Sequence, residues 1–469
     1  MSKLQTSRRS FVKQIAVLST AAFVAPNILS AGNRVDKVNL ACIGIGNRGA
    51  DIITELHKTG LANIVALCDV DMNAPHTQKI LEQFPNVPRY KDFRSMFDKM
   101  GSSIEAVSIA TPDHAHFPAT MMAMALGKHV YVEKPLGRTF QECELLLKAA
   151  NKYPKVVTQM GNQGHSEENY FQFKTWKEAG VIKDVTAITA HMNLPRRWHG
   201  WDVNMKSLPA AQTIPDTLDW NEWLSAVSEH NFNKDYVNGQ WRCWYDFGMG
   251  ALGDWGAHIL DTAHEFLELG LPHEVTPVKL DGHNPFFFPM SSTLSFKFGA
   301  RKNMPAVEVK WYDGVNNLPP IPQGYGVSGL DPNIPAPSTG ALQPAKLNPG
   351  KIIYSKDLTF KGGSHGSPLH IIPEAKAKDM KAGLPEVPKS PSNHFKNFLQ
   401  ACMGKEKTRS PFDIAVPLCQ VFNLGVLAQQ LNVPLAFDTK THKITNNKTA
   451  NALLAGPAPR KGWEQYYKV

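Results

Sequence analysis

One glycine-rich turn, at residues 44–49, limits what this chain can fold into more than any other feature. An apolar, partly β-branched run at residues 37–46 stops at glycines, and residues 48–60 continue with helical periodicity and a terminal glycine. The turn reads Gly44-Ile45-Gly46-Asn47-Arg48-Gly49. The first glycine permits the tight turn, the second lets backbone approach a pyrophosphate, and the third lets helix pack on strand. Amide groups of the helix N-terminus then face the phosphates.

The chain after this turn supports a dinucleotide-binding unit. Residues 63–71 (NIVALCDVD) predict a second buried strand, and Asp69 follows Gly49 by twenty residues. An acid at this place binds ribose hydroxyls and repels a 2′-phosphate, which favours NAD over NADP. Strand and helix patterns alternate to about residue 160, which predicts a doubly wound parallel sheet with its ligand at the carboxyl ends of the strands. Polar residues at these ends are Thr111, Asp113, His114, His116, Glu133, Lys134, Gln159 and Asn162.

Two further stretches carry candidate chemistry. Lys134 follows the strand pattern HVYV and precedes Pro135, which disfavours helical geometry and would hold the ammonium near the strand end. By position alone, a surface lysine in a turn is an equal interpretation. GALGDWGAHILD, residues 250–261, places Asp254 and His258 one helical turn apart among small residues, which we expect to leave room for a ligand. A helix cap or a metal half-site completed by Asp261 and His264 is the alternative.

Length and composition bound the remaining interpretations. A chain of 469 residues exceeds one hydrophobic core, so we expect two domains, 36–160 and 161–469. The formal net charge is +9, and four of the basic residues that contribute to it lie in residues 1–31. In the rest of the chain, no Lys/Arg block is interleaved with aromatic residues. This argues against nucleic acid as a partner.

The N-terminal residues 1–31 predict an export signal. They have a basic start, an apolar run of moderate length and small residues afterwards, which is typical of a signal peptide rather than a membrane span. The paired Arg8 and Arg9 in SRRSFVK fit the twin-arginine pattern, so we expect a periplasmic protein that is exported folded. No clean A-x-A sequence marks the cleavage site.

The six cysteines are consistent with core positions. An even count in an exported protein permits disulfides. Cys42 and Cys68 nevertheless lie in predicted buried strands, Cys143 and Cys419 lie in predicted helices, and no C-x-x-C occurs. The pattern supports neither a zinc site nor a disulfide framework, and we expect no metal.

The second part of the chain predicts strands joined by long loops. Strand patterns occupy residues 184–195, 291–314, 351–363 and 368–374, and residues 314–350 are too rich in Pro and Gly for regular structure. Residues 194–246 are dense in Trp and Arg, side chains that suit the faces and hydroxyls of a sugar ring, although most such tryptophans pack in cores or interfaces. We rank five residues above Trp220 and Trp223 as substrate-binding candidates. They are His191, Arg197, Trp198, His199 and Trp241.

The motifs GIGNRG, ATPDHAH, HVYVEKPLG and GALGDWGAHILD, in this order after an export signal, resemble the Gfo/Idh/MocA family, which includes glucose-fructose oxidoreductase and inositol dehydrogenase. The resemblance implies an NAD(P)-binding Rossmann domain and an α+β C-terminal domain with a large, mainly antiparallel open sheet through which members form homo-oligomers. In that family the lysine of E-K-P and the acid and histidine of D-x-x-x-H line the substrate site, which here are Lys134, Asp254 and His258. Motif and resemblance together give the cofactor-binding candidates Gly44, Gly46, Asn47, Arg48, Gly49, Asp69, Thr111, Pro112, His116, Glu133 and Gln163.

The expected function is oxidation of a secondary hydroxyl of a sugar or glycoside, at C3 as first choice. An exported enzyme meets little free NAD, so we expect tightly bound NAD(H) that a second sugar or another acceptor reoxidises. His258 has the pKa range of a general base, and Asp254 would orient it. Lys134 would bind the alcohol oxygen. In the alternative assignment, lysine and histidine exchange these roles.

Two alternatives stay open. One is a glycosidase that oxidises its substrate transiently; family members of that kind usually depart from E-K-P, which this chain keeps at Lys134. The other is a sugar-binding protein that retains NAD only structurally.

Overall fold

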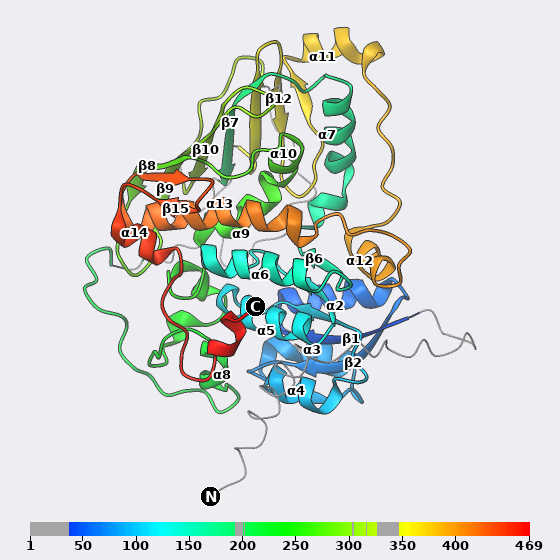
Figure 1. Ribbon diagram of the computed structural model, residues 1–469, viewed down its shortest axis with the longest axis vertical. Coiled ribbons are helices and arrows are strands. Elements are labelled where there is room, and N and C mark those ends of the chain that lie inside the picture. The colour runs from blue at the N-terminus through cyan, green and yellow to red at the C-terminus, as the bar shows by residue number, and fades with distance from the viewer. Residues whose placement is uncertain (1–36, 193–199, 201, 303, 316, 326–346) are drawn as a thin grey trace, which may run out of the picture.

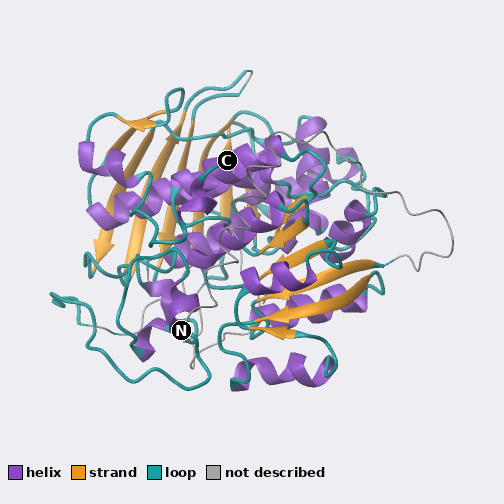
Figure 2. Ribbon diagram, turned by 60° about the horizontal axis from the view of Figure 1, so that its bottom comes forward, coloured by secondary structure: helices purple, strands orange, loops and turns teal. Residues whose placement is uncertain are grey.

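The computed structural model describes residues 37–192, 200, 202–302, 304–315, 317–325 and 347–469 (Figure 1). The predicted export signal, most of the loop 314–350 and the candidates Arg197, Trp198 and His199 lie outside the described residues. Two separate sheets, with helices between and around them, organise the chain (Figure 2).

The first sheet is the predicted doubly wound parallel sheet. Its six strands have the order β3-β2-β1-β4-β5-β6, and every neighbouring pair is parallel. The strands are β1 Val38–Ile43, β2 Ala62–Cys68, β3 Arg89–Tyr90, β4 Ala106–Ile109, β5 His129–Val132 and β6 Thr158–Met160. The crossover helices are α2 Arg48–Lys58, α3 Gln78–Gln83, α4 Phe93–Met100, α5 Asp113–Ala125 and α6 Phe140–Lys152. Strand order reverses between β1 and β4, the place where such sheets bind ligands.

The second sheet has nine strands in the order β13-β12-β11-β7-β10-β9-β8-β14-β15. They are β7 Val185–Met192, β8 Glu274–Asp281, β9 Ser291–Phe298, β10 Val307–Asp313, β11 Gly350–Ser355, β12 Thr359–Gly362, β13 His370–Ile372, β14 Leu435–Asp438 and β15 Lys443–Ile444. β10 and β7 pair in parallel and the other pairs are antiparallel, so the prediction of a mainly antiparallel sheet is confirmed. Residues of β10 alternate between buried and half-buried, because successive side chains point to opposite faces.

The remaining helices lie against this sheet or between the two sheets, except α8 and α12, which lie against the first domain. They are α7 Glu168–Glu178, α8 Trp220–Leu224, α9 Gly250–Ile259, α10 Asp261–Phe266, α11 Glu374–Met380, α12 His394–Cys402, α13 Phe412–Leu431 and α14 Lys448–Leu453. By length and composition α13 is apolar enough to cross a membrane, but 78% of its most apolar window is buried inside the protein. Figure 1 shows α13 between the second sheet and α6, and a helix that is apolar on all sides suits this central position.

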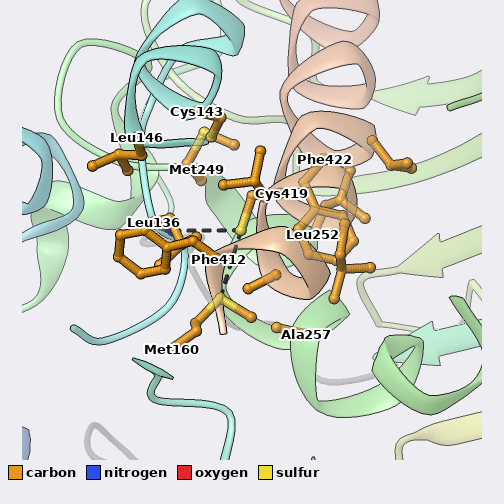
Figure 3. Packing of buried hydrophobic residues seen from close by; sticks show 14 of the residues in the cluster. Leu136, Cys143, Leu146, Met160, Met249, Leu252, Ala257, Phe412, Cys419 and Phe422 are labelled. Carbon is orange, nitrogen blue, oxygen red and sulfur yellow. Dashed lines mark hydrogen bonds between the residues drawn. The ribbon is translucent and has the colours of Figure 1, made fainter. Parts of the chain in front are cut away.

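One apolar cluster joins the two domains around α13. Cys419 on α13 places its sulfur 3.6 Å from the Met160 sulfur of β6 and 3.5 Å from the backbone nitrogen of Leu136 (Figure 3). Five of the six cysteines are buried and Cys402 is half-buried, and all six are free thiols in the structure. The predicted role of Cys42, Cys68, Cys143 and Cys419 as core residues is confirmed.

The glycines of α9 serve close packing. A side chain at Gly256 would come within 2.7 Å of the Phe422 ring on α13, and one at Gly253 within 2.2 Å of the Met249 Cβ. Gly256 therefore lets α9 approach α13 closely, and the space beside Gly253 is filled by Met249, so at these two positions glycine serves packing rather than room for a ligand.

The C-terminal residues return to the first domain, which the sequence did not indicate. Phe398 of α12 packs against the Tyr131 ring of β5 at 5.6 Å between centroids. Near the end of the chain, Tyr467 packs against Phe117 of α5 at 4.7 Å. The first domain is thus covered by segments that follow residue 390.

Candidate active site

A cleft of about 880 Å³ lies at the carboxyl ends of the first sheet's strands. One wall is formed by the turns after β1, β2, β4 and β5. The other comes from the second domain, with residues 218–242, helix α9 and the loop between β12 and β13. The predicted cofactor-binding residues line this cleft, with the exception of Gly49, which lies beneath the turn.

The glycine turn has the geometry that its motif predicts. Gly44 has φ +80°, and a Cβ there would lie 2.6 Å from the Ala110 carbonyl oxygen of the neighbouring strand end. A Cβ at Gly49 would lie 2.1 Å from the Gly44 carbonyl oxygen, so α2 can pack on the turn only with glycine here. At Gly46 the space of a side chain is taken by the His76 ring, 2.1 Å from the Cβ position. Glycine at these three positions therefore lets the Ala110 carbonyl group, the His76 ring and helix α2 pack directly against the turn.

Asp69 stands at the end of β2 and is tied to this turn. Its carboxylate accepts hydrogen bonds from the Ile45 and Asp71 backbone amides, each at 2.9 Å. Burial raises the pKa of this carboxyl above its usual range, and the two amide hydrogen bonds oppose that effect. The carboxylate thus holds a fixed position at the cleft edge where the motif requires a ribose-binding acid.

Three polar side chains that line the cleft contact one another: Arg48, Glu133 and Gln163. The Arg48 Nε lies 3.4 Å from the Glu133 Oε1, and the Glu133 side chain is only 6% exposed. With its amide oriented to satisfy both neighbours, Gln163 donates to the Gly161 carbonyl at 3.1 Å and accepts from Arg48. Three of the predicted cofactor-binding residues are thereby brought together from α2, β5 and the 3₁₀ turn Gln163–Ser166.

Thr111, Pro112 and His116 form the turn into α5. Pro112 caps the helix, and the buried Thr111 hydroxyl has no hydrogen-bond partner among the described residues. The His116 ring nitrogens lie 2.7 Å from the Pro135 carbonyl oxygen and 2.8 Å from the Thr111 carbonyl oxygen. Burial lowers the pKa of His116, while the two carbonyl oxygens act in the opposite direction, and a neutral ring donates a hydrogen bond to only one of them.

Lys134 is a buried cleft residue, which decides against the interpretation as a surface lysine. Its Nζ donates to the Asp254 Oδ1 at 2.7 Å and to the Asp254 carbonyl oxygen at 2.8 Å, and the two side chains are 10% and 6% exposed. Arg242 lies 3.5 Å from the same carboxylate oxygen and rests on the Trp241 ring at 4.0 Å. An ammonium and a guanidinium therefore share one carboxylate at the cleft wall.

His258 lies beside this group but has a partner that the sequence did not predict. We expected Asp254 to orient it, whereas the Asp254 carboxylate pairs with Lys134. The His258 ring instead stacks on His365, with centroids 3.9 Å apart and planes inclined by 19°. Its Nδ1 has no hydrogen-bond partner within the described part of the chain. Burial, followed by His365 and Lys134, holds its pKa well below the usual value, so the ring is neutral.

The aromatic candidates divide between the cleft and the core. Trp241 lines the cleft, and so does Trp223, which we had ranked below the others. His191 is fully buried in β7, with its Nε2 2.8 Å from the Asn348 carbonyl oxygen, and burial lowers its pKa to about 4. Among the described residues His191 does not line the cleft, because a position late in a strand does not tell which face of the sheet the side chain takes.

The residues of the alternative metal site have other partners. The Asp261 carboxylate is 3.2 Å from the His165 ring, and the His264 Nε2 is 2.9 Å from the Gly270 carbonyl oxygen. Across the ranges that the structure describes, no group of three or more His, Cys, Asp or Glu side chains is placed to hold a metal ion.

Two of the cleft residues that sequence reasoning missed lie close to Lys134, Asp254 and His258. Arg242 stood in the Trp/Arg-rich stretch but was not selected, and His365 was not considered at all. The available signals were the neighbouring Trp241 for the first and a glycine- and serine-flanked position (GGSHGS) after a predicted strand for the second.

Two sequence profiles match this chain. One, described as the oxidoreductase family with an NAD-binding Rossmann fold, matches residues 38–160, and the other, its C-terminal alpha/beta domain, matches residues 178–285. Inositol 2-dehydrogenase of Salmonella typhimurium is 27% identical over 203 residues, 41% of this chain and 54% of the relative. A glycosyl hydrolase family 109 protein of Shewanella amazonensis is 31% identical over 134 residues, 28% of this chain and 30% of the relative. The matches thus span about half the length of the first of these relatives and less of the second.

Solved structures show the same fold. The WlbA dehydrogenase of Chromobacterium violaceum, in complex with NADH and UDP-GlcNAcA, superposes with a TM-score of 0.57 at 14% identity, covering 89% of this chain and 99% of that one. The aldose-aldose oxidoreductase of Caulobacter crescentus gives 0.52 at 16% identity, covering 86% and 100%. With the glycine turn, Asp69 and Lys134 in one cleft, these matches show that the chain belongs to the Gfo/Idh/MocA family of oxidoreductases and that its first domain is an NAD-binding Rossmann domain.

Proposed function

We propose that this protein oxidises a secondary hydroxyl of a sugar, cyclic polyol or glycoside with NAD held in the cleft. The observation that carries the proposal is the arrangement of Lys134, Asp254 and His258 in the same cleft as the glycine turn. Inositol dehydrogenases among the relatives make cyclic polyols the first substrates to try. For sugars and glycosides, C3 is the position that we would test first.

The cleft residues fit the dinucleotide. Without side chains at Gly44 and Gly46, the backbone of this turn can approach a pyrophosphate. The Thr111 hydroxyl, which has no hydrogen-bond partner among the described residues, offers a hydrogen bond within the cleft. The Asp69 carboxylate at the cleft edge suits ribose hydroxyls and opposes a 2′-phosphate, which favours NAD over NADP.

The protein groups supply the proton chemistry of the reaction. When bound, NAD provides the acceptor for the hydride of a secondary alcohol. Lys134, fixed by Asp254, can donate a hydrogen bond to the substrate oxygen and stabilise negative charge that develops there. His258 lines the cleft and is neutral, so we assign it as acceptor of the hydroxyl proton, although its lowered pKa makes it a weaker base than a free imidazole.

Contacts between the domains support slow release of the cofactor. The Asp219 amide donates to the Val70 carbonyl oxygen at 2.8 Å, one residue after Asp69, and Lys91 donates to the Thr217 carbonyl oxygen at 2.8 Å. Glu222 also pairs with Arg94. These contacts hold residues 217–222 beside the end of β2, where the ribose-binding acid stands. We therefore propose that NAD(H) stays bound and is reoxidised in place by a second sugar or another acceptor.

Retention of the cofactor agrees with the sequence-based expectation of export. A twin-arginine signal would carry the folded, loaded protein to the periplasm. Association into homo-oligomers through the second sheet, as the resemblance implies, belongs to the same proposal.

The test is the state of the protein as purified, followed by its response to substrates. We expect an NADH or NAD content near one per chain after denaturation, and an NADH absorbance band that rises with one inositol or sugar and is bleached by the corresponding keto compound. Absence of bound cofactor, together with absence of turnover across inositols, free sugars and glycosides when NAD is added, would exclude the proposal.

A second candidate function is hydrolysis of a glycoside through transient oxidation. It is favoured by the similarity to glycosyl hydrolase family 109 proteins and to the alpha-N-acetylgalactosaminidase of Shewanella oneidensis, which is 26% identical over 207 residues. Incubation with aryl glycosides separates the two candidates, because release of the aglycone without net NADH marks a hydrolase. If Lys134→Ala and His258→Ala leave every turnover and cofactor reduction unchanged, the chain is a binding protein that retains NAD structurally.

A further inference from the structure

His365 enters the cleft from a loop far away in the sequence. The loop joins β12 to β13, and its residue 365 lines the same cleft as Lys134, Asp254 and His258. The His365 ring lies face to face with His258 at 3.9 Å and meets the edge of the Trp255 ring at 5.1 Å. The two histidines therefore form a stacked pair at the cleft wall, one from α9 and one from the second sheet.

His365 has a backbone conformation that is unfavourable for a residue with a side chain. Its φ of +51° lies in the left-handed region, which a residue with a Cβ enters at a conformational cost. The His365 amide donates to the His258 carbonyl oxygen at 2.9 Å, so the loop is bonded to the residue on which the ring stacks. Within the loop, the His365 Nδ1 is 2.9 Å from the Ser364 hydroxyl.

Close glycine contacts fix the loop from the other side. A Cβ at Gly366, which has φ +85°, would lie 2.8 Å from the Gly164 carbonyl oxygen. A Cβ at Gly164 would in turn lie 2.6 Å from the Gly366 nitrogen. The Asn169 amide also donates to the Gly366 carbonyl oxygen at 3.0 Å. The surrounding contacts thus hold this loop in a conformation that costs energy, and such backbone conformations cluster at functional sites.

We propose that His365 is a positioning residue for His258, which fixes the plane of the His258 ring and sets the pH range in which that ring carries no proton. This inference rests on the proposed role of His258 as proton acceptor. Two stacked imidazoles at this separation resist carrying two positive charges, so the presence of one histidine limits protonation of the other. The charged groups that act on His258 are, besides His365, Lys134 after β5, Arg48 on α2 and Asp254 on its own helix.

Two variants separate the ring contact from the charge. His365→Asn removes the ring and its titration, and asparagine tolerates the left-handed backbone. His365→Phe keeps a flat ring against His258 and removes the ring nitrogens, and with them the charge and the contact to the Ser364 hydroxyl. We expect the acid limb of kcat/KM to move to higher pH by about one unit in both variants. The pH-independent kcat should fall roughly tenfold in His365→Asn alone, because only there is the ring orientation lost.

His370→Phe is the matched control. His370 is an exposed histidine at the start of β13, at the far end of the same loop, and it does not line the cleft. Its variant should keep the wild-type pH profile. If His365→Asn and His365→Phe both keep the wild-type profile and kcat, the inference is wrong.

A measurement without substrate distinguishes this inference from the proposed function. With histidine labelled at the ring carbon Cε1, the resonances of His258 and His365 can be assigned among the 17 histidines by their loss in single variants and followed against pH. We expect His258 to titrate at higher pH in His365→Phe than in the wild type. A shift in a protein that turns over no sugar would uphold the pairing and refute the function; turnover without any shift would refute the pairing alone.

Discussion

A buried histidine between two carboxylates predicts a stability loss at alkaline pH. His165, which is 1% exposed, places its Nδ1 3.2 Å from the Asp261 carboxylate and its Nε2 2.5 Å from the Glu265 carboxylate. Burial opposes the charged ring, but the hydrogen bonds and charges of the two carboxylates prevail and raise the pKa of His165 from 6.5 to about 9. The folded protein thus holds an imidazolium where the unfolded chain would hold a neutral ring at neutral pH.

The direction and size of the effect follow from this shift. Because the folded-state pKa is the higher one, the stabilisation is complete below pH 6.5 and is lost as pH rises through about 9. The shift from 6.5 to about 9 corresponds to about 3 kcal/mol of unfolding free energy. Removing the ring leaves two carboxylates facing each other, a change of similar size.

The assay compares the wild type with His165→Gln in thermal unfolding from about pH 6 to about pH 10. We expect His165→Gln to unfold several degrees earlier at about pH 6 and to approach the wild type at about pH 10. His264→Gln is the control, because burial lowers the pKa of His264 to about 4 and its ring is neutral across this range. A difference between wild type and His165→Gln that stays constant over the whole range would refute the reasoning.

Three further substitutions test the cleft. Asp254→Asn leaves the Lys134 ammonium without its carboxylate, so kcat should fall on the order of a hundredfold while the NAD content of the purified protein, measured after denaturation, stays the same. Gly49→Ala should abolish cofactor retention and lower stability by about 1–3 kcal/mol in denaturant titration, whereas Gly299→Ala, with open space around its Cβ, should do neither. Glu222→Gln should speed NAD release measured by dilution into an NAD-consuming enzyme, and an unchanged release rate would count against the proposed hold on the cofactor.

The local parts of this fold were readable from the sequence. The turn at Gly44, the strand that ends at Asp69 and the alternation up to residue 160 depend on neighbours within a few dozen residues, and the structure has them as predicted. The hairpin patterns of the second sheet were equally readable. A strand with one covered face alternates apolar and polar residues with a period of two, and this alternation is visible in the sequence.

The parts that failed depend on distant residues. The environment of Lys134 is decided by Asp254, 120 positions further along, and that of His258 is decided by His365 in the loop between β12 and β13. His191 satisfied the sequence criterion for a site residue, yet its side chain is fully buried and its ring meets the Asn348 carbonyl oxygen. Spacing shows which residues share an element, but only packing of one element on another shows what each side chain meets.

The shared core around α13 also determines which fragments of the chain could fold independently. A fragment ending near residue 160 would keep all six strands of the nucleotide-binding sheet. It would lose α12 from the face of Tyr131 and the C-terminal rings from Phe93 and Phe117, leaving large apolar surfaces in water. The nucleotide-binding half therefore depends on residues as far along as Tyr467 for its packing, and we expect a fragment cut near residue 160 to expose these apolar surfaces.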